Sequence, residues 1–253
     1  MSSQDNTEMG RYWSADSAHY GSIIRDELAS FRREAWKARF ALHVPQRAKV
    51  LDFGCGPGFF SILLAEMGHS VTGIDIAAGM VSQARAHAAS ECLASPPSFI
   101  HTEAGLSHFA AETFDVIVSR NVTWTLSDPV GFYREALPRL RPGGRLLVYD
   151  ANWHLPLFDE ALAARCARAE QACIERYGCT FEPASIDADP IDVAALPLSA
   201  QVRPAWDVKA LNEVGFSEVH TDLSIIETLW DEKEKLVYGE TPLFEIVASK
   251  RAH

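Results

Sequence analysis

Hydrophobic and polar residues follow two different periods along this chain, and each change of period predicts a new element. Near the start, apolar residues recur at helical spacing over Ile24, Leu28, Phe31 and Ala35, with charged residues between them. This pattern predicts an amphipathic helix, and Pro45 closes the region.

Short apolar runs then alternate with helical patterns from Lys49 to Asp150. Strands that are apolar on both faces are typical of parallel sheets buried between helices. The predicted strands are residues 49–54, 70–75, 98–102, 113–120 and 145–150, the last one preceded by a turn at 142–144. The alternation predicts an α/β fold with a doubly wound sheet.

The pattern changes after Asp150. Residues 153–180 have a helical period, whereas the stretch 182–204, which is rich in Pro, Asp and Ala, has none, so we expect an irregular insertion there. A helix that stops at Gly215 follows. Two final strands, 217–226 and 243–251, are expected on either side of a polar connection.

Composition narrows the class of protein. The 253 residues are 47% hydrophobic and carry a formal net charge of −11, which predicts a sizeable core and argues against broad binding of nucleic acid. The N-terminus lacks the pattern of a signal peptide, and no apolar run is long enough to span a membrane. We therefore expect a soluble, cytoplasmic protein.

The five cysteines are an odd number in a large chain, which argues against a disulfide framework. Cys166 and Cys173 share an apolar stripe with Phe158, Leu162 and Tyr177. We interpret them as core thiols on one helix face.

The segment VLDFGCGPGFF, residues 50–60, places Gly54, Gly56 and Gly58 between a predicted strand and a predicted helix. Glycines let a backbone approach a ligand closely, and the start of a helix offers free N–H groups. Asp75 ends the next strand, where a carboxylate can accept hydrogen bonds from both hydroxyls of a ribose. The GxGxG spacing differs from the dinucleotide pattern GxGxxG, and Asp52 suits a cationic group better than a pyrophosphate. The loop favours a nucleoside with a cationic tail.

These motifs, followed by TEAG (102–105), FDVIVSRNVTWTLSDP (114–129) and LRPGGRLLVYD (140–150), resemble the ordered motifs of class I S-adenosylmethionine (SAM)-dependent methyltransferases over about residues 48–152. The resemblance implies a Rossmann-like sheet of seven mainly parallel strands with an antiparallel last strand. It also implies an N-terminal lid helix, a helical insertion after the fifth strand, SAM as cofactor, and methyl transfer to an O, N, S or C atom of a small molecule.

The resemblance further implies roles for single residues. Asp75 would hold the ribose hydroxyls, Ile76 would touch the adenine, and the pair Glu103 and Ala104 would take the adenine amino group. The whole set of implied cofactor contacts is Asp52, Gly54, Cys55, Gly56, Gly58, Asp75, Ile76, Glu103, Ala104, Arg120 and Asn121.

Aromatic residues at two places are expected to form the substrate side, one group ahead of the first helix and one after the fourth and fifth strands. The expected substrate contacts are Tyr12, Trp13, His19, Tyr20, Trp124 and Trp153. His154 is the candidate general base, because an imidazole titrates near neutral pH. No metal is expected.

The expected organisation has four parts: an N-terminal helical lid (1–45), a cofactor-binding core (46–152), an insertion that completes the substrate pocket (153–205), and a C-terminal helix and strand pair of the same domain (206–253). The expected partner is a small-molecule acceptor, without nucleic acid or membrane, and the chain would act as a monomer or homodimer.

Four alternatives stay open at this point. A methyltransferase acting on RNA or protein would share the same core, although the acidic charge weighs against RNA. An NAD-dependent oxidoreductase is disfavoured by the GxGxG spacing. A non-catalytic SAM-binding regulator would keep the same motifs. A thiol-dependent metalloid methyltransferase would use Cys166, Cys173 and Cys179.

Overall fold

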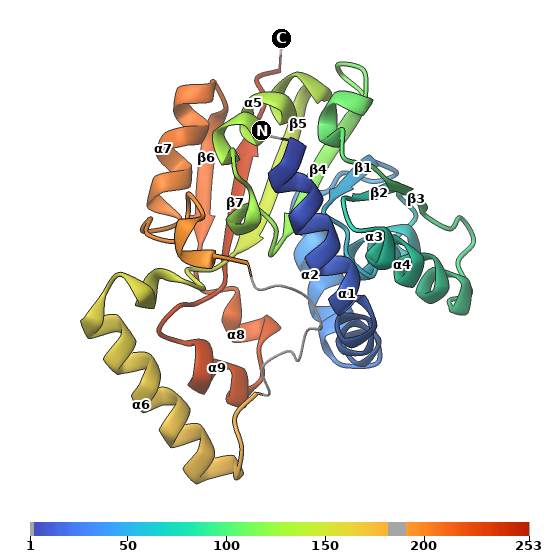
Figure 1. Cartoon of the computed structure of the whole chain (residues 1–253). Coiled ribbons are helices and arrows are strands. Elements are labelled where there is room, and N and C mark those ends of the chain that lie inside the picture. The colour runs from blue at the N-terminus through green and yellow to red at the C-terminus, as the bar shows by residue number, and fades with distance from the viewer. Residues whose placement is uncertain (1–2, 182–190, 253) are drawn as a thin grey trace.

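Seven strands form one sheet in the order β3-β2-β1-β4-β5-β7-β6 (Figure 1). The computed structural model describes residues 3–181 and 191–252. The strands are β1 Lys49–Phe53, β2 Ser70–Asp75, β3 Ser98–His101, β4 Phe114–Arg120, β5 Leu140–Asp150, β6 Ser217–Asp222 and β7 Phe244–Ser249. The last strand, β7, pairs antiparallel with both β5 and β6, and the pairs among β1 to β5 are parallel. The predicted fold class is confirmed.

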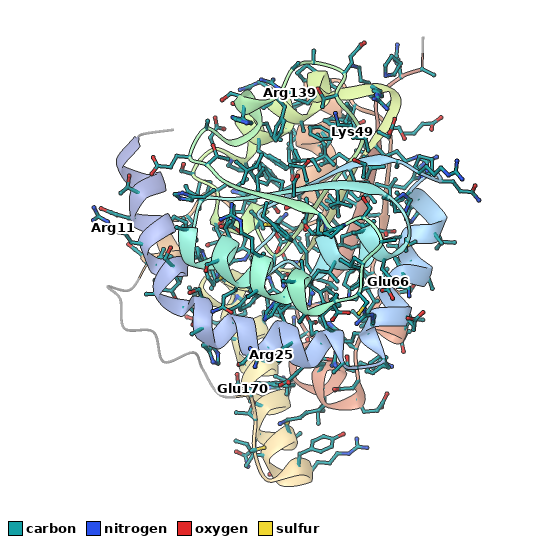
Figure 2. All side chains as sticks on the ribbon, turned by 90° about the vertical axis from the view of Figure 1, so that its right-hand side faces the viewer. Arg11, Arg25, Lys49, Glu66, Arg139 and Glu170 are labelled. Carbon is teal, nitrogen blue, oxygen red and sulfur yellow. The ribbon has the colours of Figure 1, made fainter. Side chains whose placement is uncertain are left out.

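Helices cover both faces of this sheet. They are α1 Ser3–Leu28, α2 Arg32–His43, α3 Phe59–Glu66, α4 Ala78–Ser90, α5 Pro129–Arg139, α6 Glu160–Tyr177, α7 Ala205–Val214, α8 Ile226–Leu229 and α9 Glu232–Tyr238. Short 3₁₀ turns occur at Gly105–His108, Thr123–Thr125, Leu155–Leu157 and Val193–Ala195. Figure 2 shows α1 running beside α4, with Arg11 and Arg25 along it.

The core consists of two apolar clusters that share the sheet. Along β1, Val50 belongs to the cluster under α1 to α4, while Leu51 belongs to the cluster under α5 and α7. Leu147 and Val148 of β5 divide in the same way. Successive side chains of a strand point to opposite faces, so a strand buried on both faces must be apolar at every position. This is why the strands could be predicted as continuous apolar runs.

The N-terminal prediction was wrong in its boundaries. Two helices replace the single one expected, and the aromatic segment expected ahead of it lies inside α1. The break falls at Ser30, whose Oγ donates to the Glu27 carbonyl oxygen at 2.8 Å and accepts from the Arg32 N–H at 3.2 Å. A serine side chain that bonds to nearby backbone competes with the helical ladder. Phe31, expected in the apolar stripe, is 51% exposed at this break.

Two further expectations were wrong in detail. Residues 142–144, expected as a turn, lie inside β5, where the register against β4 shifts between Phe114 and Val116 and Gly143 has a φ of 75°. The polar connection after β6 contains α8 and α9. Asp231 and Glu234 begin α9 with a capping box, in which each side chain accepts from the other's backbone N–H.

Helices α6 and α9 pack together beyond the carboxyl ends of the parallel strands (Figure 1). In Figure 2, Glu170 of α6 lies at the opposite end of the molecule from Lys49, which begins β1. The apolar stripe that contains Cys166 and Cys173 is only partly buried. Cys173 is buried, but Phe158 and Tyr177 are 49% and 38% exposed. The five cysteines are free.

Within the described ranges, no helix combines the length and the apolar character needed to cross a membrane.

Candidate active site

The candidate site lies where the strand order reverses. Strand β1 has β2 on one side and β4 on the other, so the connections after β1 and β4 leave the sheet in opposite directions. Open α/β sheets bind ligands at the carboxyl ends of the strands at such a switch point. The glycine loop follows β1 here, and Asn121 follows β4.

The glycine loop has a backbone that only glycine adopts freely. Gly54, Gly56 and Gly58 have φ angles of 68°, 51° and 93°. A Cβ on Gly54 would lie 2.4 Å from a methyl group of Val122, so the loop is pressed against the residues after β4. Cys55 is buried within the loop, and its N–H donates to the Ile74 carbonyl oxygen at 2.9 Å. The loop is thereby tied to β2 as well as β4.

Asp75 links the loop to the start of α4. One carboxylate oxygen accepts from the Gly56 N–H and the other from the Ala77 N–H, both at 2.8 Å. Burial raises the pKa of Asp75, and these two backbone hydrogen bonds act against that rise. Each carboxylate oxygen keeps acceptor capacity beyond one N–H, so the side chain can still accept from ligand hydroxyls.

The next residues line the edge of the same site. Ile76 is half-buried, and its carbonyl oxygen lies 3.0 Å from the His101 Nε2. Glu103 and Ala104 are exposed just after β3, and the Ala104 N–H donates to the Thr102 Oγ1 at 3.0 Å. The structure therefore places the predicted adenine-contacting residues beside Asp75, at the carboxyl ends of β2 and β3.

Asp52 lies behind the loop and is only 2% exposed. Its carboxylate accepts from the Ser61 Oγ at 2.6 Å, and burial raises the pKa of Asp52 to about 7, with Asp75 adding to the rise and Arg120 opposing it. The Asp52 side chain bonds to α3 and is shielded from solvent.

Helix α1 crosses directly over this loop. A Cβ on Gly10 would lie 2.9 Å from the Ile76 carbonyl oxygen, and the Gly79 N–H donates to the Ser14 Oγ at 3.3 Å. Tyr20 lies 3.8 Å from the position that a Cβ on Gly56 would take. The site is thus bounded by the sheet on one side and by α1 on the other.

Helix α1 holds Arg120, because both terminal nitrogens of its guanidinium are bonded to Glu27 of that helix. Its two terminal nitrogens bind the Glu27 carboxylate at 2.9 and 2.6 Å, and the guanidinium lies over the rings of Trp36, Phe59 and Phe60. Only Nε remains buried without a partner. Arg120, which the resemblance implied as a cofactor contact, therefore fastens α1 to the end of β4.

Asn121 has a strained backbone next to this ion pair. Its φ is 55°, which is uncommon for a residue with a side chain and occurs most often where function or a tight turn requires it. The Asn121 side chain lies near Tyr20, and its Oδ1 is buried without a hydrogen-bond partner among the described residues. A buried acceptor without a donor is costly in free energy. A bound ligand with donor groups would satisfy it.

Aromatic rings connect α1 with the loops after β4 and β5. Trp13 lies edge-on to Tyr12, Tyr20 and Trp124, with ring centroids 5.2, 6.1 and 6.2 Å apart, and Trp124 lies 4.8 Å from the His154 ring. Residues far apart in the sequence therefore form one aromatic cluster above the sheet. This cluster brings together five of the residues predicted for substrate binding and catalysis.

His154 is half-buried in this cluster, and its Nε2 has no hydrogen-bond partner. Burial lowers the pKa of His154, although the nearby charge of Asp150 opposes the effect. Two predicted substrate residues lie elsewhere: His19 is exposed on α1, and Trp153 packs against Tyr238 of α9.

A buried polar network lies next to Trp124 and Trp153. The Asp150 carboxylate accepts from the Thr123 Oγ1, the Trp124 N–H, the Ala151 N–H, the Trp153 Nε1 and the Arg203 Nη1 at 2.5 to 3.2 Å. Arg203 also binds Asp207 of α7, and all three charged side chains are at most 1% exposed. One carboxylate therefore positions both Trp124 and Trp153 and anchors the end of the insertion.

The sequence pattern did not single out Glu27, Arg203 or Asp16, a residue of α1 that is 3% exposed. A weak sequence signal exists for Asp16 and Glu27, since their helical spacing places them with Tyr20 on the face of α1 that turns towards the loop. Arg203 carries none, because it lies in a stretch without periodicity. Among the described residues, no group of three or more His, Cys, Asp and Glu side chains is arranged to hold a metal ion.

Residues 51–148, which contain the glycine loop, β2 to β4 and most of β1 and β5, match the family profile described as "Methyltransferase domain". This part of the chain is a methyltransferase domain. A protein named ubiquinone biosynthesis O-methyltransferase from Xanthomonas axonopodis pv. citri is 32% identical over 149 residues, which are 56% of each chain. One of the same name from Ruegeria pomeroyi is 36% identical over 104 residues, 41% of each. The chain spans about half the length of the curated relatives it matches.

Solved structures share the whole architecture of this methyltransferase-domain protein. A SAM-dependent methyltransferase of Methanosarcina mazei aligns with a TM-score of 0.58 and 23% identity, covering 85% of this chain and 97% of the other. The [4+2]-cyclase SpnF aligns with a TM-score of 0.62 and 16% identity, covering 98% and 97%. At these identities the likeness shows the fold alone.

Proposed function

We propose that this protein is a SAM-dependent methyltransferase that transfers a methyl group to a hydroxyl oxygen of a small molecule. The observation that carries the proposal is a methyltransferase domain whose glycine loop and Asp75 meet at the switch point of the sheet. The residues fit SAM, because Gly56 presents no side chain towards Tyr20 of α1 and Asn121 Oδ1 is a buried acceptor without a donor among the described residues. When bound, SAM supplies an electrophilic methyl group on a sulfonium.

Methyl transfer is an in-line displacement, so the protein mainly aligns the acceptor and keeps water out. The aromatic cluster of Trp13 and Trp124 suits a partly apolar acceptor. A hydroxyl must lose its proton during attack, and we assign its acceptance to the His154 Nε2, which has no hydrogen-bond partner among the described residues. Because burial keeps this imidazole neutral at pH 7, it is a base in the required form. The curated relatives are named as O-methyltransferases, which supports oxygen as the acceptor atom.

The fold does not by itself decide the reaction, since a named cyclase shares it. Two experiments therefore test the proposal in order. Calorimetry with SAM and S-adenosylhomocysteine (SAH) on the folded protein tests binding, and an acceptor panel of hydroxyl, amine and thiol compounds, read out as SAH formed, tests transfer. Absence of SAM binding contradicts the proposal. Binding without turnover, or turnover only on amines, proteins or RNA, contradicts the assignment of a hydroxyl acceptor.

Replacing His154 tests the proton acceptor. His154→Gln should lower kcat by about 10²–10⁴-fold with an accepted hydroxyl compound, while SAH affinity stays within about twofold. In the native enzyme, log kcat/KM should fall on the acid side with a pKa below 6.5, because burial lowers the pKa of His154 and protonation removes the base. The control is His220→Gln, an exposed histidine on β6. Full activity of His154→Gln would remove the assigned role.

A further inference from the structure

Asp16, on the inner face of α1, is a buried carboxylate without a counter-charge bonded to it. The residue is only 3% exposed, and its Oδ1 makes no hydrogen bond. Burial raises the pKa of Asp16, and the charge of His19 opposes the rise, but that histidine is exposed and does not bond to Oδ1. Burying an unpaired carboxylate is costly, and the described residues supply no bonded partner for Oδ1, which points to a ligand.

The position of Asp16 follows from its helix. Trp13, Asp16 and Tyr20 are spaced by three and four residues, which places them on one face of α1. Trp13 contacts Trp124 after β4, while Tyr20 lies over Gly56 of the glycine loop. Asp16 therefore lies between the aromatic cluster and the loop, on the side of α1 that faces the active site.

A second unpartnered acceptor belongs to the same region. Asn121 Oδ1 is buried without a donor among the described residues, and the Asn121 side chain lies near Tyr20, which is on the same face of α1 as Asp16. The cation of this region, Arg120, is occupied at both terminal nitrogens by Glu27. Two acceptors thus face the site beneath α1, and the nearby guanidinium is committed to another carboxylate.

We propose that Asp16 is a cofactor-recognition residue whose carboxylate, together with Asn121 Oδ1, receives the cationic methionine end of SAM. This rests on the proposed function and deepens it, since the glycine loop and Asp75 hold the nucleoside while α1 supplies the group that recognises positive charge. Two cationic groups share that chemistry, the α-ammonium and the sulfonium. Either one would give the Asp16 carboxylate the counter-charge that it lacks.

The test is calorimetric binding of three ligands to the full chain and to Asp16→Asn. SAM carries both cationic groups, SAH keeps only the ammonium, and 5′-methylthioadenosine keeps neither. Asp16→Asn should weaken SAM binding by about 10- to 100-fold, as expected for a lost charge-assisted hydrogen bond, and leave methylthioadenosine within about twofold. An equal loss for SAH assigns the ammonium, and unchanged SAH binding assigns the sulfonium. The control is Asp26→Asn, an exposed acid on the same helix.

A second readout separates recognition from damage to the lid. Without ligand, Asp16→Asn should unfold at the same or a higher urea concentration than the native chain, because an unpaired buried charge is removed. Unchanged SAM affinity, or equal losses for SAM and methylthioadenosine, overturns the assignment to Asp16. If the native chain does not bind SAM at all, the proposed function fails first, so the two failures are distinguishable.

Discussion

Two strands of the sheet carry a buried aspartate near their carboxyl ends. The two aspartates differ in their hydrogen-bond donors and in whether a cation is bonded to them. Asp52 of β1 has the Ser61 hydroxyl as its donor, and its pKa is raised to about 7. Asp150 of β5 accepts five hydrogen bonds, one of them from Arg203. The glycine-loop side of the site thus has a buried acid without a bonded cation among the described residues, whereas on the other side Asp150 and Asp207 share the bonded guanidinium of Arg203.

With the proposed function, we infer that the first region receives a ligand's charge and that the second region holds the shape of the site. Asp16 and Asp52, both at most 3% exposed, surround the loop without a bonded cation. Around Asp150, Arg203 and Asp207 complete an ion network that fixes Trp124 and Trp153. We expect substitutions in the first region to change binding and pH dependence, and substitutions in the second to change stability.

The largest expected effect is from Arg203→Met, which leaves Asp150 and Asp207 buried without their counter-charge. The free energy of unfolding should fall by about 3–5 kcal/mol, measured by urea denaturation. The matched control is Arg165→Met, which breaks the exposed ion pair with Glu240 and should leave the denaturation midpoint nearly unchanged. If both variants behave alike, the Asp150 network is not a stabilising scaffold.

The next effect is from Gly56→Val. A β-branched residue at a φ of 51° is strained, and its side chain would project towards Tyr20 where the ligand is expected. SAM affinity should fall by about 100-fold or more in calorimetry. Gly68→Val is the control, because Gly68 has a φ of 87° with open space around it, so backbone strain is introduced without touching the site. Equal affinity in the two variants would make the loop a simple turn.

Asp52→Asn should change how stability depends on pH. Between the ordinary pKa of about 3.9 and the folded value of about 7, the folded chain keeps a proton that the unfolded chain has lost. The native free energy of unfolding should therefore fall as pH rises through this window, by about 2–3 kcal/mol between pH 5 and pH 8 relative to Asp52→Asn. Parallel pH curves for the two proteins would show that Asp52 ionises normally.

The smallest expected effect is from Asp75→Ala, which removes a carboxylate that bonds Gly56 and Ala77. SAM binding should weaken by about 1–3 kcal/mol through the loss of charge-assisted hydrogen bonds. Asp115→Ala is the control, since Asp115 accepts from the Lys49 N–H at the opposite end of β1. It should lower stability and leave affinity unchanged. Unaltered affinity in Asp75→Ala would argue against a contact with the ribose.

The sequence by itself determined the strands, the glycine loop and the acid after β2. These features depend on residues close together in the sequence. An apolar run buried on both faces predicts a parallel strand, and three glycines after it predict a tight loop. The methyltransferase resemblance rests on the same contiguous stretch, about residues 48–152, which is why it could be recognised without a structure. The family profile matches residues 51–148 within it.

Only the tertiary structure decided the rest of the site. Arg203 reaches Asp150 across 53 positions, and Arg120 reaches Glu27 across 93, through side chains whose partners no periodicity reveals. The length of α1 and the burial of Asp16 depend equally on what the helix packs against. A buried charge is specified by its three-dimensional surroundings, because the free energy of burying it depends on which groups surround it in the folded chain.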